Sequence, residues 1–338
     1  MTISNVQVYQ LVRIRRQYPT VISKQIHADG IRPVEESLFV LFEVVTDTGL
    51  RGIGEVSDLE PDAVPDLPAL QEALRRALIG RSPYEVATIQ TLLPEHAAAG
   101  APLGTGLYRC AVDMALHDLQ GKAAGAPIYQ LLGGARRDAI RISAVVYIRD
   151  ASLVSEEVRE RREQGFRDFK LKVGLGLEQD EASLAALREA AGPEAHVKID
   201  PNGAWDVDEA IRCLRRLEKY NVAGVETPIP APDLEGKLAL KKEITIPILE
   251  HVSTPEFALA CAKTGAVDVF NLSLCGCGGL YRAGKVAAVA EAAGIRCLLG
   301  STLELWPGTA AQAHFGASVG PLEFPSDLVG PLMYQSDV

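Results

Sequence analysis

HVKID at 196–200 is a short apolar run that ends in a carboxylate, and the pattern returns in VAGVE at 222–226 and IPILE at 246–250. Each run has the length and composition of a buried strand. About 25 residues separate one carboxylate from the next, which accommodates one strand, one loop and one helix, the repeat of a (β/α) barrel. We therefore expect the three final carboxylates to surround one mouth, because the strands of such a barrel end at the same face.

The alternation of strand and helix continues from about residue 140 onward. The predicted fold class is therefore α/β, a (β/α)7β TIM-like barrel with an α+β N-terminal capping domain. An eighth strand is either irregular or supplied by residues 130–140, because SDLVGPLMYQSDV at 326–338 contains no obvious closing element. The predicted strands are IRISAVVYI (140–148), FRDFKLKVG (166–174), HVKIDPNG (196–203), VAGVETP (222–228), IPILEH (246–251), VDVFNLS (267–273) and IRCLLGS (295–301). Helices are predicted at 154–164, 178–191, 206–219, 255–264, 279–293 and 308–318.

The first 56 residues or so alternate apolar and polar residues with a period of two, which indicates a three-stranded antiparallel meander. Asp-Thr-Gly at 47–49 is typical of a hairpin turn. Residues 15–36 form a long connection between the first two strands, either a lid or binding loop or a plain surface connection. Helices are predicted within 65–80 and 109–125. The predicted domains are 1–125 for the cap, 126–325 for the barrel and 326–338 for a C-terminal return toward the cap.

Composition excludes several classes of partner. The formal net charge of −10 argues against nucleic acid or an anionic membrane surface. No run approaches the length of about 18 apolar residues that a membrane helix needs, and the start lacks the order of a signal peptide. Six scattered cysteines fit reduced, buried thiols better than a disulfide framework. We expect a cytoplasmic enzyme that acts on a small molecule.

The predicted mouth gathers three carboxylates, Asp200, Glu226 and Glu250, and two lysines, Lys170 and Lys172. Carboxylates that share a site raise one another's pKa unless a cation balances them, and a hard divalent ion with oxygen ligands does so. Mg²⁺ is the expected ion, with Mn²⁺ as an alternative. The lysines share a strand face, and two ammonium groups ~4 Å apart repel by roughly 4 kcal/mol, which favours a neutral amine on one of them.

These motifs resemble the enolase superfamily, in the branch of mandelate racemase and muconate lactonizing enzyme. The resemblance covers most of the chain. It implies a Mg²⁺-dependent enzyme that abstracts the proton α to a carboxylate, with Lys172 transferring the proton and Lys170 adjusting its pKa. It also implies a homo-oligomer and a loop of the cap that closes over the substrate. The matching stretches are ALHDLQGKAAGAPIYQLLGG (115–134), KLKVG (170–174), DPNGAW (200–205), GVETP (224–228) and GSTLE (300–304).

Two positions depart from that branch, which usually has a lysine at the end of the sixth strand and Asp-Glu at the fifth. This chain has Ser273 and the pair Glu250-His251 there. Serine is no unaided base near neutral pH, so racemisation with a base on each face is disfavoured and one-base chemistry remains. Ser273 is then a substrate contact or a proton relay. His251 alternates away from Glu250, which favours a structural role over that of a second acid.

Further candidate residues lie near the predicted strand ends and in the cap. Asn202 either orients a metal ligand or caps the next helix, and Glu304 contacts the substrate or Lys170, or forms a structural salt bridge. Trp306 either lines the pocket or packs. Tyr18 and Thr20 lie in the long N-terminal connection that the resemblance places over the substrate.

The favoured hypothesis is proton abstraction followed by β-elimination of water, as in a hydroxy-acid or sugar-acid dehydratase. The alternative within the same chemistry is a muconate-type cycloisomerase or an amino-acid-derivative racemase or epimerase. A third hypothesis, from a different class, is a non-catalytic barrel that binds a ligand. The conjunction of Lys172 with three carboxylates argues against this third hypothesis.

Overall fold

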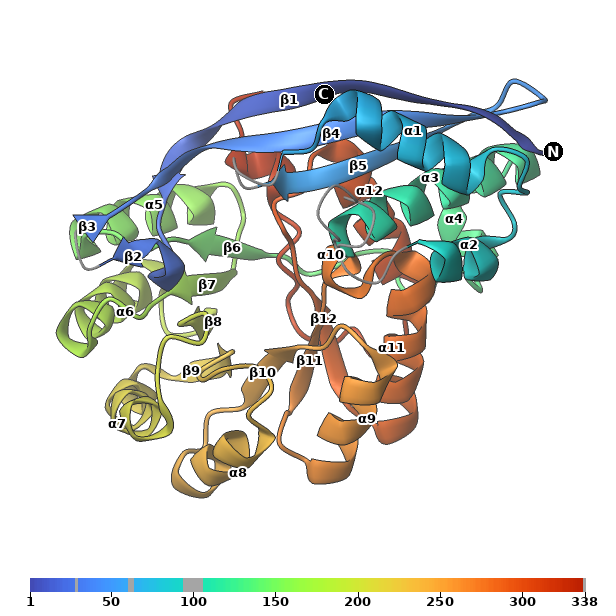
Figure 1. The fold of residues 1–338 in the computed structure, drawn as a ribbon. Helices are drawn as coiled ribbons and strands as arrows, with labels where there is room; N and C mark the ends of the chain where they lie inside the picture. Colours follow the sequence, from blue (N-terminus) through green and yellow to red (C-terminus); the bar gives the residue numbers. More distant parts are fainter. Residues whose placement is uncertain (28–29, 60–63, 94–105, 337–338) are drawn as a thin grey trace.

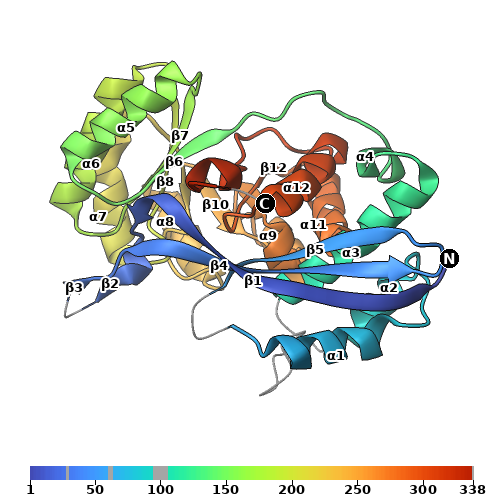
Figure 2. The same cartoon turned by 90° about the horizontal axis from the view of Figure 1, so that it is seen from above.

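The computed structural model describes residues 1–27, 30–59, 64–93 and 106–336. A three-stranded antiparallel sheet lies across one end of a barrel of parallel strands (Figures 1 and 2). Helices surround the barrel on its outside, as Figure 1 shows for α5 to α9 and α11. The mixed α/β class and the antiparallel N-terminal domain predicted from the sequence are confirmed.

The capping sheet has the order β1-β4-β5, and its two hairpin partners meet at the predicted Asp-Thr-Gly turn. Gly49 has φ +83°, a conformation that glycine adopts without strain, and its amide donates to Thr46 O at 3.0 Å. From Val40 to Thr46 alternate residues of β4 are buried, as the period of two predicts, whereas residues 37–40 are all buried. The elements of the cap are β1 (Ile3–Thr20), η1 (Ser23–Gln25), β2 (Ile26–His27), β3 (Gly30–Ile31), β4 (Val34–Thr46), β5 (Arg51–Leu59), α1 (Leu67–Leu78), α2 (Val86–Leu92) and α3 (Gly106–Ala124).

The long connection expected at residues 15–36 is shorter than predicted. Strand β1 continues through Thr20, and β4 begins at Val34, so much of the expected loop pairs as strand. Arg16 interrupts the alternation of apolar and polar residues, because it is charged but occupies a buried position of the strand. Its buried guanidinium is neutralised by Asp58 at 2.9 Å. A charged residue at a buried strand position does not register as alternation of apolar and polar residues.

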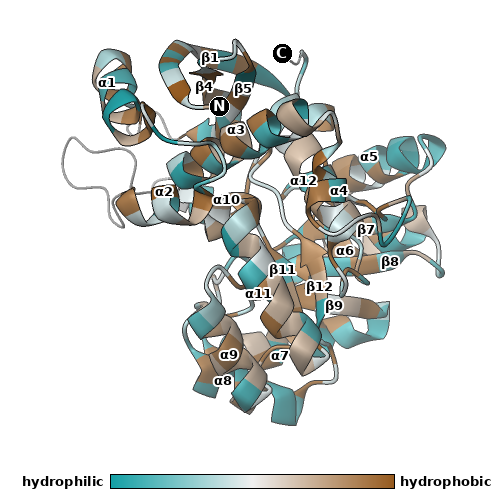
Figure 3. Cartoon of the chain, turned by 90° about the vertical axis from the view of Figure 1, so that its right-hand side faces the viewer, coloured by the Kyte–Doolittle hydropathy of each residue, from teal (hydrophilic) through white to brown (hydrophobic). Residues whose placement is uncertain are grey.

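The barrel sheet contains seven parallel strands in the order β12-β11-β10-β9-β8-β7-β6. The seven predicted strands are all present, and many of their apolar side chains pack between the sheet and the surrounding helices. The ribbon of β11 and β12 is mainly brown in Figure 3. Its strands are β6 (Ser143–Val146), β7 (Asp168–Lys172), β8 (His196–Asp200), β9 (Val222–Glu226), β10 (Ile248–His251), β11 (Val269–Leu272) and β12 (Arg296–Leu299). Its helices are α4 (Ile128–Leu131), α5 (Ala151–Glu163), α6 (Leu177–Ala191), α7 (Val207–Leu217), η4 (Glu218–Tyr220), α8 (Leu234–Glu243), α9 (Pro255–Thr264), α10 (Leu274–Cys277), α11 (Leu280–Ala293), α12 (Trp306–Ser318) and η5 (Gly330–Met333).

An irregular segment, residues 321–327, lies between β12 and β6 and closes the barrel. Ser143 N donates to Ser326 O at 2.8 Å, and on the other side Asp327 N donates to Leu299 O at 2.8 Å. The sequence offered an irregular eighth strand or residues 130–140, and the irregular form is the one observed. The expectation that the C-terminal stretch holds no closing element is wrong, because Ser326 and Asp327 belong to this segment.

The chain continues from this segment toward the cap. Tyr334 Oη donates to Leu303 O at 2.7 Å, and Gln335 N donates to Arg15 O at 3.1 Å. The domain boundaries proposed from the sequence stay a prediction. The six cysteines are free and buried. Within the described ranges, no helix has the length and apolarity needed to cross a membrane.

Candidate active site

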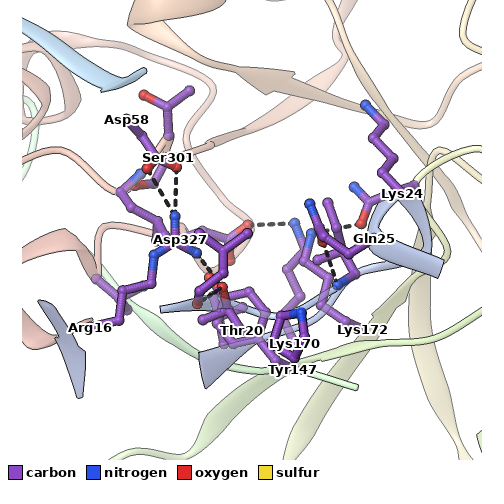
Figure 4. Close-up of a pocket in the computed structure, with 18 of the residues that line it drawn as sticks. Arg16, Thr20, Lys24, Gln25, Asp58, Tyr147, Lys170, Lys172, Ser301 and Asp327 are labelled. Carbon is purple, nitrogen blue, oxygen red and sulfur yellow. Dashed lines mark hydrogen bonds and ion pairs between the residues drawn. The ribbon is translucent and has the colours of Figure 1, made fainter. Parts of the chain in front are cut away.

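A pocket of about 990 Å³ lies between the cap and the carboxyl ends of the barrel strands. Figure 4 shows Arg16 and Asp58 of the cap on one side of it and Lys172 on the other. The barrel side of the pocket is lined by Val145, Tyr147, Lys170, Lys172, Asn202, Glu226, His251, Asn271, Ser301, Thr302, Leu303, Asp327 and Val329.

Lys170 is held by three carboxylates at the centre of this mouth. Its Nζ lies 2.6 Å from Glu226 Oε1, 2.9 Å from Asp200 Oδ2 and 3.1 Å from Asp327 Oδ2. Burial lowers the pKa of Lys170, but the three negative charges outweigh it and raise this pKa well above the ordinary value. Lys170 is therefore a permanent cation in this arrangement.

Lys172 has the opposite electrostatic character. Its Nζ contacts Asp200 Oδ2 at 2.6 Å and Asn202 Oδ1 at 3.2 Å. Burial lowers the pKa of Lys172, and the neighbouring Lys170 charge lowers it further, so that the net shift is downward despite Asp200. The repulsion between the two lysines acts in the direction that the sequence predicts, although burial is the larger cause.

The three predicted metal ligands lie at the ends of consecutive strands and are fully buried. In the part of the chain that the structure describes, no three His, Cys, Asp or Glu side chains are grouped so that they could hold a metal ion. Each carboxylate is turned toward protein cations instead: Asp200 toward both mouth lysines, Glu226 toward Lys170, and Glu250 toward Lys237 at 3.0 Å.

Glu250 faces α8 and does not line the pocket, because the neighbouring Leu249 is in register with the pocket residue Glu226 and His251 extends into the pocket. The prediction of Glu250 as a metal ligand is therefore not supported by this geometry. Asp200 and Glu226 remain as buried carboxylates beside a polar pocket, which fits a hard cation. Glu226 Oε2 is buried and has no hydrogen-bond partner, and Glu226 itself lines the pocket. A buried carboxylate oxygen without a partner is costly unless a ligand or an ion satisfies it.

His251 extends into the pocket and not into the barrel wall, where the alternation of strand residues suggested it would point. Its Nε2 lies 3.1 Å from Glu226 Oε1, and about two-fifths of the side chain is exposed (41%). Desolvation lowers the pKa of His251, but the Glu226 carboxylate outweighs this effect and raises it. The imidazole is thus a pocket group paired with a predicted metal ligand.

Ser273 follows β11 but is not among the described residues that line the pocket. Its Oγ accepts a hydrogen bond from Gly276 N at 3.1 Å and thereby caps α10. The β11 residue that does line the pocket is Asn271, whose buried amide oxygen and nitrogen both lack a hydrogen-bond partner.

The remaining predicted residues are dispersed. Thr20 lines the pocket, whereas Tyr18 lies outside the lining and donates to Glu160 Oε2 at 3.2 Å. Glu304 is buried and accepts from Thr302 N at 3.0 Å and from Cys275 Sγ at 3.6 Å, and it is not among the lining residues. Trp306 is 64% exposed and outside the lining. The structure does not bring these last three residues to the pocket.

Three polar residues of this region are not predicted from the sequence: Asp327, Asn271 and Lys237. Asp327 bridges Lys170 and the fully buried Lys198, whose Nζ lies 2.8 Å from Asp327 Oδ1. No local pattern marks it, since it lies in an irregular segment. The sequence could have indicated that Lys237 is buried, because it lies on the same face of α8 as Leu240, about one turn earlier.

A capped α/β barrel with lysines and carboxylates at successive strand ends defines a class of barrel enzyme whose active site is at the mouth. A protein-family model described as "Enolase C-terminal domain-like" matches residues 153–337. A second family model, for the N-terminal domain of mandelate racemase and muconate lactonizing enzyme, matches residues 12–133. The chain belongs to the enolase superfamily, in its mandelate racemase and muconate lactonizing enzyme branch.

Several characterised proteins are similar to it. A hydrophobic dipeptide epimerase from Enterococcus faecalis is 31% identical over 87% of this chain and 83% of its own length. Muconate cycloisomerase 1 from Rhodococcus opacus is 33% identical over 88% of this chain and 82% of its own. The crystal structure of the Enterococcus faecalis epimerase with Mg and the dipeptide L-Leu-L-Tyr superposes with a TM-score of 0.88 at 28% identity, covering 100% of this chain and 93% of that one.

These relatives are isomerases of the enolase superfamily, and the prediction of an enzyme of this superfamily is confirmed. Their activities are epimerisation and cycloisomerisation. They support the alternative that the sequence offered over the dehydration that it favoured.

Proposed function

We propose that this protein is a one-base isomerase of the muconate-cycloisomerase type, in which Lys172 moves the proton α to a substrate carboxylate. The observation that carries the proposal is the asymmetry of the mouth. Lys170 and Lys172 lie on β7, whereas the β11 residue lining the pocket opposite them is the neutral Asn271.

Lys172 is suited to proton transfer because its pKa is depressed while that of Lys170 is raised. The neutral amine takes the α-proton, and the electron pair that remains is delocalised into the carboxylate as an enolate. In the lactone-opening direction, the C–O bond β to the carboxylate then breaks and its oxygen leaves as a second carboxylate. In the reverse direction, that carboxylate closes the ring and the Lys172 ammonium returns the proton.

Asp200 and Glu226 would hold a divalent cation, for which Mg²⁺ is proposed and Mn²⁺ is the alternative. When bound, the ion supplies positive charge that offsets the second negative charge developing on the substrate carboxylate. Lys170 adds a fixed ammonium at the same place, and Asn202 holds Lys172 through the 3.2 Å contact. Crystals of a relative that contain Mg support this assignment.

A turnover screen tests the proposal. The purified protein is incubated with Mg²⁺ and muconolactone, cis,cis-muconate and substituted muconates, alongside dipeptides and N-acylated amino acids, and products are followed by proton NMR. We expect interconversion of a lactone and a diacid that is lost with EDTA and in Lys172→Met. Turnover that survives in Lys172→Met contradicts the assignment of this base.

Epimerisation of a dipeptide is the second candidate, favoured by the TM-score of 0.88 to the Enterococcus faecalis epimerase. It needs a proton donor on the face opposite Lys172, and the Ser273 hydroxyl caps α10. Inversion of a dipeptide in the same screen would favour this candidate and require another acid in the pocket.

A further inference from the structure

His251 faces the pocket beside the two carboxylates of the proposed metal site. It is the last residue of β10, as Asp200 is of β8 and Glu226 is of β9. These three strands are neighbours in the barrel sheet. Each of them therefore ends in a side chain with a potential metal donor at the same mouth, and the donor on β10 is an imidazole nitrogen.

Glu250, the residue that the sequence predicts for this role, is turned away from the pocket. Its Oε2 lies 3.0 Å from Nζ of Lys237 on α8, and its Oε1 accepts from Thr227 Oγ1 at 2.8 Å. The side chain of His251, in contrast, lines the pocket and is 41% exposed. The geometry of β10 thus offers the pocket a histidine and not a carboxylate.

The spacing of His251 and Glu226 suits two neighbouring ligands of one ion. His251 Nε2 lies 3.1 Å from Glu226 Oε1. Two donors at about 2.1 Å from an ion and at a right angle to each other lie about 3.0 Å apart. The second oxygen, Glu226 Oε2, is buried and has no hydrogen-bond partner among the residues that the structure describes. A buried carboxylate oxygen in this state is costly unless a further ligand satisfies it.

We infer that His251 is the third protein donor of the proposed metal site and shifts its preference from Mg²⁺ toward Mn²⁺. This inference rests on the proposed function. Mg²⁺ takes oxygen ligands almost exclusively, whereas a first-row transition ion accepts an imidazole nitrogen beside carboxylate oxygens. A site with two carboxylates and one imidazole therefore discriminates against Mg²⁺ more strongly than a site with three carboxylates.

Binding of an ion between these donors requires side chains to rotate. In the structure Lys170 Nζ lies 2.9 Å from Asp200 Oδ2 and 2.6 Å from Glu226 Oε1, so its ammonium separates the two carboxylates. Within the described ranges, the three donors accordingly do not surround one point. Nitrogen coordination by His251 is for this reason a result that only a measurement on the loaded protein can give.

His251→Asp replaces the nitrogen donor by an oxygen donor and keeps a third ligand at the same strand end. We expect Mn²⁺ still to bind and the nitrogen signal of the bound ion to disappear. We also expect the ratio of Mn²⁺ to Mg²⁺ affinity to fall by roughly tenfold or more, since residues that only support a metal ligand already contribute about 10–100-fold to affinity.

His27→Asp is the matched control. His27 lies on β2 of the cap and also lines the pocket, so the same substitution is made at a second pocket histidine that is not on a barrel strand. We expect this variant to keep both the nitrogen signal and the wild-type ratio of affinities.

The experiment uses each purified full-length protein and Mn²⁺ as the probe. Pulsed electron paramagnetic resonance detects ¹⁴N coupled to bound Mn²⁺, and competition with Mg²⁺ gives the ratio of affinities. Nitrogen coupling in the wild type and in His27→Asp that is lost in His251→Asp, with the lower ratio, supports the inference.

Two results would overturn it. Bound Mn²⁺ without nitrogen coupling in the wild type, or coupling that persists in His251→Asp, removes His251 from the donor set and leaves the metal part of the proposed function intact. Absence of Mn²⁺ binding in the wild type overturns that part as well. If His251→Asp cannot be purified, His251→Gln adds no negative charge and should likewise lose the nitrogen coupling.

Discussion

The two walls of the barrel mouth differ in charge. The wall formed by β7 to β10 contributes Lys170, Lys172, Glu226 and His251 to the pocket. The wall formed by β11, β12 and the turn after β12 contributes Asn271 and three further residues without charge among the described residues. Counting residues 321–327 as the eighth member of the barrel, β11 lies directly across from β7.

Under the proposed function, this difference favours proton transfer on one face of the substrate. The cap also lines the pocket with an ion pair, Arg16 with Asp58 at 2.9 Å. Its further charged or titratable lining residues are Lys24, His27, Arg32, Glu35 and Glu36. The charged wall also explains why Lys170 and Lys172 differ, since Lys170 contacts three carboxylates and Lys172 contacts one. Proximity to Asp200, Glu226 and Asp327 thus decides which lysine remains charged.

The largest expected effect follows from removal of the base on the charged wall. Lys172→Met is expected to lower kcat by ~10²–10⁴-fold or more, the usual contribution of a positioned proton-transfer group. Steady-state kinetics with the substrate found in the screen measures this loss. Lys219→Met, on the exposed surface, serves as the control and should retain full activity; an equal loss there would point to misfolding.

A new activity is expected when the neutral wall gains an amine. Ser273→Lys places an amine directly after β11, the strand across the barrel from β7 and Lys172, and we expect slow exchange of the α-proton on the second face. Proton NMR in D₂O of the substrate's unreactive enantiomer detects this exchange. Ser273→Met has a similar length without the amine and should show none, and exchange in that variant would contradict the explanation.

A carboxyl group behind the neutral wall gives stability a pH dependence. Burial raises the pKa of Glu55 to about 7, against hydrogen bonds from Ser57, Gly308 and Leu305 that lower it. Because the folded protein holds this proton more tightly than the unfolded chain, its stabilising contribution is full below the ordinary pKa of 4.5 and is lost as the pH rises through about 7. The loss amounts to about 3 kcal/mol.

Urea denaturation between pH 5 and pH 8 measures this dependence. Glu55→Gln keeps an oxygen acceptor for the Leu305 amide and removes the titration, so its stability should vary less over this range. A wild type that is equally stable at both ends, or a Glu55→Gln variant with the wild-type slope, would exclude Glu55 as the source.

The smallest expected effect distinguishes two roles of Ser273, that of the N-terminal cap of helix α10 and that of a proton relay. Ser273→Ala removes the side chain that caps α10 and should cost about 1 kcal/mol of unfolding free energy, while kcat stays within a factor of about two. Thermal unfolding and steady-state kinetics measure the two quantities. A fall in kcat of about tenfold or more would restore Ser273 to the catalytic set.

The sequence predicted those parts of the molecule that local pattern encodes. The seven parallel strands carry continuous apolar runs, and the ends of such strands meet at one face, so Lys170, Asp200 and Glu226 were expected together. Residues 321–327 escaped prediction, because their backbone hydrogen bonds with β6 and β12 are irregularly spaced and leave no periodic pattern in the sequence. The pairing of Lys237 with Glu250 escaped for a similar reason, since sequence spacing does not reveal which helix side chain reaches which strand end.

Isotope exchange on both enantiomers of the substrate is the direct test of whether the enzyme moves protons on one face only. Each enantiomer of the substrate found in the screen is incubated with the Mg²⁺-loaded enzyme in D₂O, and loss of the α-proton signal is followed by NMR. We predict exchange in one enantiomer, abolished by Lys172→Met, and none above background in the other. Exchange of both enantiomers at comparable rates would contradict the account, because a second base would then face Lys172.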